Sequence, residues 1–223
     1  MSPSPIAVAV VSDVVCPWCY LGKRRLARAL DLLPEIAVSV RWLPFRLDPT
    51  IPPQGIDREA YLNGKFGSVE AVRGAHQQLV ERGRAEGIDF RFDLIRRSPN
   101  TVDAHRLIRW AAAGGVEDEM VERLFAAYFS QGRDVGDAEV LTQLAAAAGL
   151  DGADIKARLA AETDRAEVAA EIDNAYRAGI DAVPCFIIDQ RYAVMGAHPP
   201  EQIAKVIAEV AAAAGEPAAP APM

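Results

Sequence analysis

The chain has 223 residues, of which 51% are hydrophobic and 25% are charged, a composition typical of globular proteins and not of disordered ones. It has 24 Lys and Arg against 31 Asp and Glu, and the formal net charge of -7 disfavours binding to nucleic acid or to anionic membranes. The N-terminus lacks the features of a secretory signal, and no apolar run reaches the roughly 20 residues of a membrane span, so we expect a cytoplasmic protein.

The first elements predicted along the chain are a strand, a helix and a second strand. Residues 6–11 are continuously apolar and partly β-branched, which is typical of a strand buried on both faces. Apolar side chains then recur at helical spacing up to Leu33, and Pro34 ends the helix. Residues 36–42 alternate between apolar and polar side chains, which predicts a half-buried strand.

The middle of the chain is predicted to be helical. A Pro-rich turn occupies residues 47–55, and beyond it Gly, Pro and Asn separate segments that are rich in helix-forming residues. These segments predict helices over residues 57–65, 68–86, 101–114, 117–130, 137–148 and 151–162.

The end of the chain returns to mixed character. A helix is expected over residues 164–178, followed by a strand over 183–188 and its hairpin partner over 192–195. A last amphipathic helix ends at Gly215, and a frayed tail is expected over 216–223.

Together these elements predict an α/β fold in which an all-helical domain is inserted into a small sheet flanked by helices. We expect residues 1–48 plus 164–223 to form the sheet domain and residues 49–163 to form the helical insertion domain.

Two of the three cysteines form the motif Cys16-Pro17-Trp18-Cys19, which in a cytosolic protein near a βαβ pattern is typical of a redox site. Cys16 falls where the first strand gives way to a helix, and the N–H groups of a helix start stabilise a thiolate. We expect Cys16 to attack and Cys19, one helical turn on, to resolve. Pro17 suits the first helical turn, and Trp18 offers an apolar surface beside the thiol.

The second part of the signature is Val183-Pro184, at the start of a predicted strand. A cis bond before Pro184 would expose the backbone of Val183, where an extended substrate chain could pair.

Three segments together resemble the DsbA family of oxidoreductases, and in particular its FrnE-like cytosolic branch. They read S-D-V-V-C-P-W-C-Y at residues 12–20, S-P-N-T-V-D-A-H-R-L at residues 98–107 and A-V-P at residues 182–184. The resemblance spans nearly the whole chain. It implies a thioredoxin-like fold with an inserted all-helical domain, and a dithiol oxidoreductase or isomerase activity. It also implies that Cys16 is the nucleophile and Cys19 the resolving thiol, with a cis-Pro loop beside them.

The cysteines have structural alternatives. A zinc site needs four ligands, and only Cys185 and three scattered His residues remain, so we expect no metal. The pair could also be two packing cysteines without chemistry. Cys185 is either a third thiol able to regulate the pair or a small buried strand residue, and we favour the second interpretation.

Other polar residues near these motifs also allow two interpretations. His105 either lines the cleft and contacts substrate or packs inside a helix interface, and both stay open. Asp13 is either a proton acceptor for Cys19 or a turn residue, and we favour the turn. The basic run at residues 23–25 is expected to be a solvated helix face, with a contribution to an electropositive setting of Cys16 as the alternative. His76 and His198 are expected to be surface or capping residues.

The expected activity is disulfide exchange with a protein or a small-thiol substrate, by a monomer or homodimer. No bound cofactor is expected, and glutathione or another low-molecular-weight thiol is a candidate co-substrate. The alternative enzyme is a glutathione-dependent isomerase or transferase of the kappa-class or 2-hydroxychromene-2-carboxylate isomerase type. Those related enzymes generally carry Ser in place of the first Cys, and they place a Gly-(Ser/Asn)-Asp-Arg-like element where residues 196–199 read Gly-Ala-His-Pro. A binding module or chaperone that uses the cleft is a third hypothesis.

Overall fold

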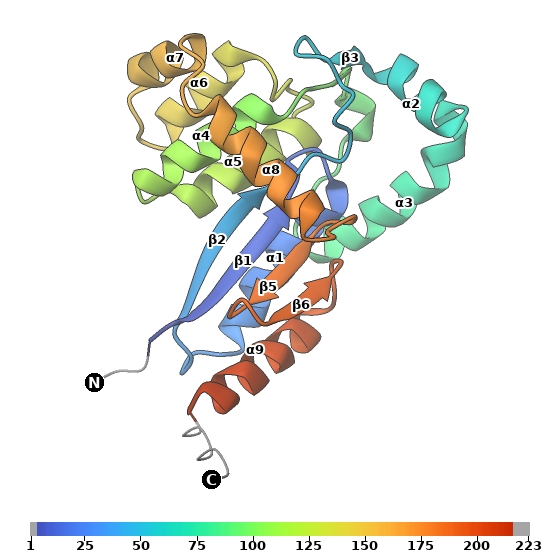
Figure 1. Cartoon of the computed structure of the whole chain (residues 1–223). Coiled ribbons are helices and arrows are strands. Elements are labelled where there is room, and N and C mark those ends of the chain that lie inside the picture. The colour runs from blue at the N-terminus through green and yellow to red at the C-terminus, as the bar shows by residue number, and fades with distance from the viewer. Residues whose placement is uncertain (1–3, 216–223) are drawn as a thin grey trace.

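The computed structural model describes residues 4–215, which form a small sheet below a block of helices (Figure 1). Each predicted helix and strand is present, with its ends shifted by a few residues. The tail expected over 216–223 lies outside the described residues. No helix of the described part is both long and apolar enough to cross a membrane.

The sheet is mixed and has β1 (Ile6–Ser12) near its centre. It pairs in parallel with β2 (Val38–Pro44) on one side and antiparallel with β5 (Cys185–Ile188) on the other, and β6 (Tyr192–Met195) extends β5 as a hairpin. β1 confirms the predicted strand, and its side chains are buried on both faces from Val10 on, whereas Ala7 is exposed and Ala9 is half-buried near its start.

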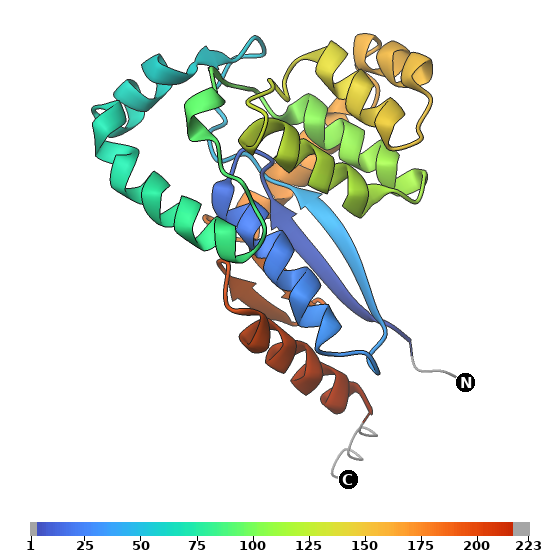
Figure 2. The same ribbon diagram turned by 180° about the vertical axis from the view of Figure 1, so that it is seen from behind.

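Helices cover both faces of this sheet. α1 (Pro17–Asp31) and α9 (Pro200–Gly215) lie side by side on one face, as Figure 2 shows from behind. α8 (Arg165–Arg177) crosses the other face near the ends of β1 and β2, where it contacts β2 and also α4 (Val102–Ala113) of the helical block (Figure 1). The predicted α/β arrangement is therefore present, with the helical block above the carboxyl ends of the parallel strands.

The helical insertion packs directly on α1. Phe125 of the insertion stacks on Tyr20 of α1 with ring centroids 5.0 Å apart, so one hydrophobic core runs through both parts. The helices of this block that precede α8 are α4 (Val102–Ala113), α5 (Glu117–Phe129), α6 (Ala138–Ala147) and α7 (Gly152–Ala160).

A helical arm stands apart from this block. It consists of α2 (Arg58–Phe66) and α3 (Val69–Ala85), which arch outward in Figure 1 before the chain returns through a short 3-10 turn (η1, Phe92–Leu94). A two-residue ladder between β3 (Ile56–Asp57) and β4 (Arg97–Ser98) closes the base of the arm. The sequence pattern does not predict this ladder because two residues are too short to show an alternation.

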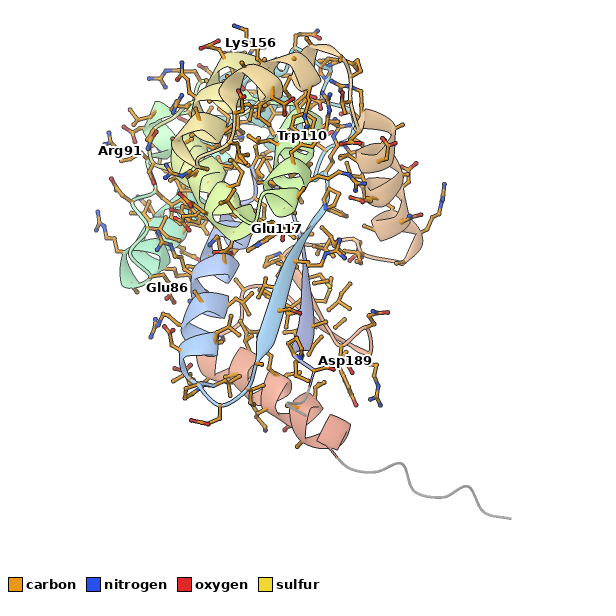
Figure 3. The ribbon with its side chains drawn as sticks, turned by 90° about the vertical axis from the view of Figure 1, so that its left-hand side faces the viewer. Glu86, Arg91, Trp110, Glu117, Lys156 and Asp189 are labelled. Carbon is orange, nitrogen blue, oxygen red and sulfur yellow. The ribbon has the colours of Figure 1, made fainter. Side chains whose placement is uncertain are left out.

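The prediction of a solvated face at residues 23–25 is wrong. Lys23 is buried and pairs with Asp118 of α5 at 2.8 Å, and Arg25 pairs with Glu86 at 2.9 Å. In Figure 3, Glu86 lies beside α1, where it also meets Arg28. The basic residues 23–25 thus form ion pairs that join α1 to α5 and to the end of α3.

Candidate active site

The Cys16–Cys19 motif lies at the junction between the end of β1 and the start of α1. Cys16 is the N-cap of α1 with an extended backbone (φ -91°, ψ 113°), and Pro17 is the first helical residue. The turn between them and β1 is closed by a hydrogen bond of 3.0 Å from the Cys16 N–H to the Asp13 carbonyl. Pro fits here because its ring supplies the helical φ and the first N–H of a helix has no intrahelical partner. The Cys16 side chain therefore projects from the helix start.

The loop before β5 meets this thiol from the far end of the chain. The Val183–Pro184 peptide bond is cis, and the Val183 carbonyl oxygen lies 3.7 Å from Cys16 Sγ. Gly22 of α1 allows the close approach, because a Cβ there would come within 2.8 Å of Pro184 Cγ. The two motifs of the sequence, 167 residues apart, are thus in direct contact.

Cys19 lies deeper than Cys16. Its exposed fraction is 0%, against 3% for Cys16. Burial raises the pKa of Cys19 well above that of an ordinary cysteine, the adjacent Cys16 thiol raises it further, and the Ser12 hydroxyl and the Asp13 backbone lower it in part. The pair is asymmetric: an outer thiol at the helix cap and an inner thiol that holds its proton tightly.

Trp18 faces outward between the two cysteines. It is 37% exposed, and the guanidinium of Arg82 on α3 lies 5.4 Å from the centroid of its ring. The helical arm therefore reaches over the motif. Nothing in the sequence marks Arg82 as a neighbour of the motif, because it lies 63 positions after Cys19, beyond two strands and within a later helix.

His105 lies in the interior. Its Nε2 is 3.0 Å from the Phe45 carbonyl oxygen and 3.7 Å from Asp13 Oδ1. The other carboxylate oxygen of Asp13 accepts a hydrogen bond of 2.8 Å from the Leu47 N–H. Asp13 is therefore more than a turn residue, since it ties the motif to the chain after β2. Contact of His105 with substrate stays a prediction.

The remaining titratable residues singled out in the sequence lie as follows. Cys185 is buried in β5 opposite Val11 and Met195, and burial raises its pKa. His76 is half-buried and stacks on Phe92 at 4.1 Å between ring centroids, so it is more than a surface residue. Within residues 4–215, no group of three or more His, Cys, Asp or Glu side chains is placed to hold a metal ion.

Comparison with known proteins identifies a family. The model of the DSBA-like thioredoxin domain matches residues 7–208. The Bacillus subtilis protein YwbO is 30% identical over 184 residues, which cover 82% of this chain and 86% of YwbO.

Two solved structures are informative. A probable DsbA oxidoreductase from Streptomyces coelicolor superposes with a TM-score of 0.86 at 32% identity, over 98% of this chain and 94% of that one. A 2-hydroxychromene-2-carboxylate isomerase superposes with a TM-score of 0.67 at 13% identity, over 93% and 95% of the two chains. The second likeness concerns the fold alone. The mixed sheet with its helical insertion is thus a thioredoxin-like fold.

Proposed function

Because the chain belongs to the family of the DSBA-like thioredoxin domain, we propose that it is a thiol–disulfide oxidoreductase with Cys16 as nucleophile and Cys19 as resolving thiol. The observation that carries this proposal is the position of Cys16 Sγ at the cap of α1, 3.7 Å from the Val183 carbonyl, with a buried second thiol beside it. A packing pair of cysteines would need neither the helix cap nor the facing loop.

In the first step, the Cys16 thiolate attacks one sulfur of a substrate disulfide. The new bond joins Cys16 Sγ to that sulfur, the substrate S–S bond breaks, and the other substrate sulfur leaves as a thiolate that takes up a proton. The start of α1 favours the negative charge on Cys16 before attack.

In the second step, Cys19 loses its proton and attacks Cys16 Sγ. The Cys16–Cys19 disulfide forms and the second substrate thiol leaves, so the dithiol gives up two electrons and the substrate disulfide gains them. Since burial raises the pKa of Cys19, this step is expected to be the slower one at neutral pH. The sequence of steps is reversible, and an oxidised enzyme would transfer its disulfide to a substrate dithiol.

Substrate contacts are proposed for Pro17, Trp18, Val183 and Pro184. Pro17 and Trp18 flank the thiol, and the exposed face of Trp18 gives apolar area to a substrate. We propose a protein disulfide or a small-thiol disulfide as substrate, with glutathione or a similar thiol as co-substrate and no bound cofactor. The FrnE-like branch, the cytoplasmic location and the monomer-or-homodimer state stay predictions.

Trapping the mixed disulfide tests the proposal. The Cys19→Ser variant cannot resolve, so after reaction with oxidised glutathione its intact mass is expected to rise by one glutathionyl group, located on Cys16 by peptide mapping. Cys16→Ser keeps Cys19 and Cys185 and is the matched control, which is expected to stay unmodified. Equal labelling of the two variants, or labelling of Cys185, would refute the assignment of Cys16.

A further inference from the structure

A cavity of about 340 Å³ opens beside the redox motif. Val15 and Pro17, the two sequence neighbours of Cys16, both line it. The turn after β2 and the two helices of the arm supply most of the remaining wall. The apolar lining residues of these elements include Leu47, Ile51, Leu62, Phe66, Val72, Ala75 and Leu79. The cavity is large enough for a small organic molecule, and it borders both sequence neighbours of Cys16, while Cys16 itself is not one of the lining residues.

One guanidinium in this cavity has no carboxylate partner. Arg58 donates a hydrogen bond of 3.2 Å to the Ser98 hydroxyl and lies 6.0 Å from the centroid of the Tyr61 ring. Among residues 4–215, no carboxylate lies within 4.0 Å of its nitrogens. A half-buried cation held in place by a neutral hydroxyl is suited to bind an anion.

The lysine that lines the cavity already has a carboxylate partner. Lys65 pairs with Asp48 at 3.2 Å and donates to the Tyr61 hydroxyl at 2.8 Å. Asp13 accepts from the Leu47 N–H through Oδ2, while its buried Oδ1 has no hydrogen-bond partner among residues 4–215 and, as a carboxylate oxygen, offers nothing to an anion. The pKa of His76 is lowered by burial and by the charge on Arg58, so its imidazole is neutral at neutral pH. Arg58 is therefore the lining cation left to receive a ligand.

Access to Cys16 favours a small substrate. With 3% exposed, and with the Val183 carbonyl and the Trp18–Arg82 contact close by, Cys16 offers little room to a disulfide on a folded surface. A low-molecular-weight disulfide needs only a narrow approach, and its body can occupy the adjoining cavity.

We propose that this cavity binds one half of a low-molecular-weight disulfide that has an apolar body and a carboxylate, with the carboxylate on Arg58 and the S–S bond at Cys16. This inference rests on the proposed function and names its substrate class. The apolar walls contact the body of the molecule, while Arg58 and Ser98 select the anionic end. Exchange then follows the two steps given above.

Calorimetric titration with 4-(phenylthio)benzoate tests the pocket, because this diaryl thioether has the required body and carboxylate but no disulfide to exchange. The wild-type chain is expected to bind it at one saturable site. Arg58→Gln should weaken binding by about tenfold or more, as expected for loss of a hydrogen-bonded charge. Arg73→Gln, on the same arm but outside this cavity, is the matched control and should bind as the wild type does.

Two further measurements test the pocket assignment. The neutral 4-(phenylthio)benzamide should bind wild type and Arg58→Gln equally, since it lacks the carboxylate. Ala75→Phe, an exposed lining position that a larger side chain can fill without disturbing the core, should weaken binding of both probes.

The pocket assignment is overturned if wild type shows no saturable binding, if Arg58→Gln binds the carboxylate as well as wild type, or if Ala75→Phe has no effect. These outcomes are separate from the trapping experiment on Cys16. The thioether reports on the cavity without any exchange, and the glutathionyl adduct reports on the thiol without requiring this cavity.

Discussion

Cys16 and Cys19 are three positions apart, yet their surroundings differ. Cys16 caps α1 and faces the Val183 carbonyl, whereas Cys19 is enclosed next to the Ser12 hydroxyl. The roles of the two thiols follow from this difference, because the outer thiol can meet a substrate and the inner one can meet only Cys16. Their order in the chain alone is compatible with either assignment.

The high pKa of Cys19 gives a test at the level of single thiols. In reduced Cys16→Ser the remaining thiols, Cys19 and Cys185, both have raised pKa values, chiefly because of burial. Ultraviolet absorbance of the thiolate is therefore expected to show no titration step below the ordinary cysteine value of about pH 8.5. A step near neutral pH would contradict the buried setting of Cys19.

Gly22 is a second residue whose substitution has a specific expected effect. A methyl group there would press on Pro184 and on the Phe186 ring, whose nearest atoms lie 2.8 and 3.2 Å from the added Cβ. Gly22→Ala should lower the free energy of unfolding by about 1–3 kcal/mol and slow mixed-disulfide formation, since the loop facing Cys16 must shift.

Gly74→Ala is the control for this substitution. Gly74 lies inside α3 with open space around its missing side chain, so the same change there should stabilise the chain by about 0.5–1 kcal/mol. Urea unfolding of both variants gives the comparison. Equal effects at the two positions would show that α1 does not constrain the Pro184 loop.

At the scale of elements, Arg106 connects α4 to the end of α7. Its buried guanidinium donates to the carbonyl oxygens of Arg158, Leu159 and Thr163 and pairs with Asp103 at 2.8 Å. These carbonyls lie at and just beyond the C-terminal end of α7, where those of Arg158 and Leu159 accept long backbone hydrogen bonds of 3.3 and 3.4 Å.

Removing this guanidinium should destabilise the helical insertion. Arg106→Ala is expected to cost about 3 kcal/mol in the free energy of unfolding, because three carbonyls lose a charged donor and Asp103 loses its buried partner. Arg109→Ala, one turn along the same helix in a solvent-exposed pair with Glu171, should cost less than about 1 kcal/mol. Urea denaturation distinguishes them, and similar costs would contradict the capping role of Arg106.

Most elements could be predicted from the sequence, because apolar periodicity and Gly or Pro breaks are local signals. Contacts between elements could not be predicted from the sequence. Residues 23–25 look like a solvated basic face until α5 supplies Asp118 as the partner of Lys23. The contact of Arg82 with Trp18 arises only because the arm folds back over the motif.

At the active site, the sequence predicts those residues whose role is marked by a local motif. The cysteine pair and its helix start could be recognised from the motif and the preceding strand. Arg58 could not be recognised as a cavity cation, because its lack of a carboxylate partner is a property of the assembled arm. Ser12 likewise gains its place beside Cys19 only when the turn closes.

At the scale of the whole molecule, sheet and insertion share one core. Trp42 of β2 and Trp110 of α4 belong to the same hydrophobic cluster. Unfolding by urea is therefore expected to be a single cooperative transition. Fluorescence of two single-tryptophan variants, one keeping Trp42 and one keeping Trp110, should give the same midpoint. Two separate midpoints would show that the insertion unfolds on its own.

The redox equilibrium of the cysteine pair tests the central claim most directly. The wild-type chain would be equilibrated in buffers of reduced and oxidised glutathione, quenched with an alkylating agent and mapped by mass spectrometry. We predict one two-electron transition in which Cys16 and Cys19 form a disulfide while Cys185 remains a thiol. A pair that stays reduced at every potential, or a disulfide that includes Cys185, would contradict the account.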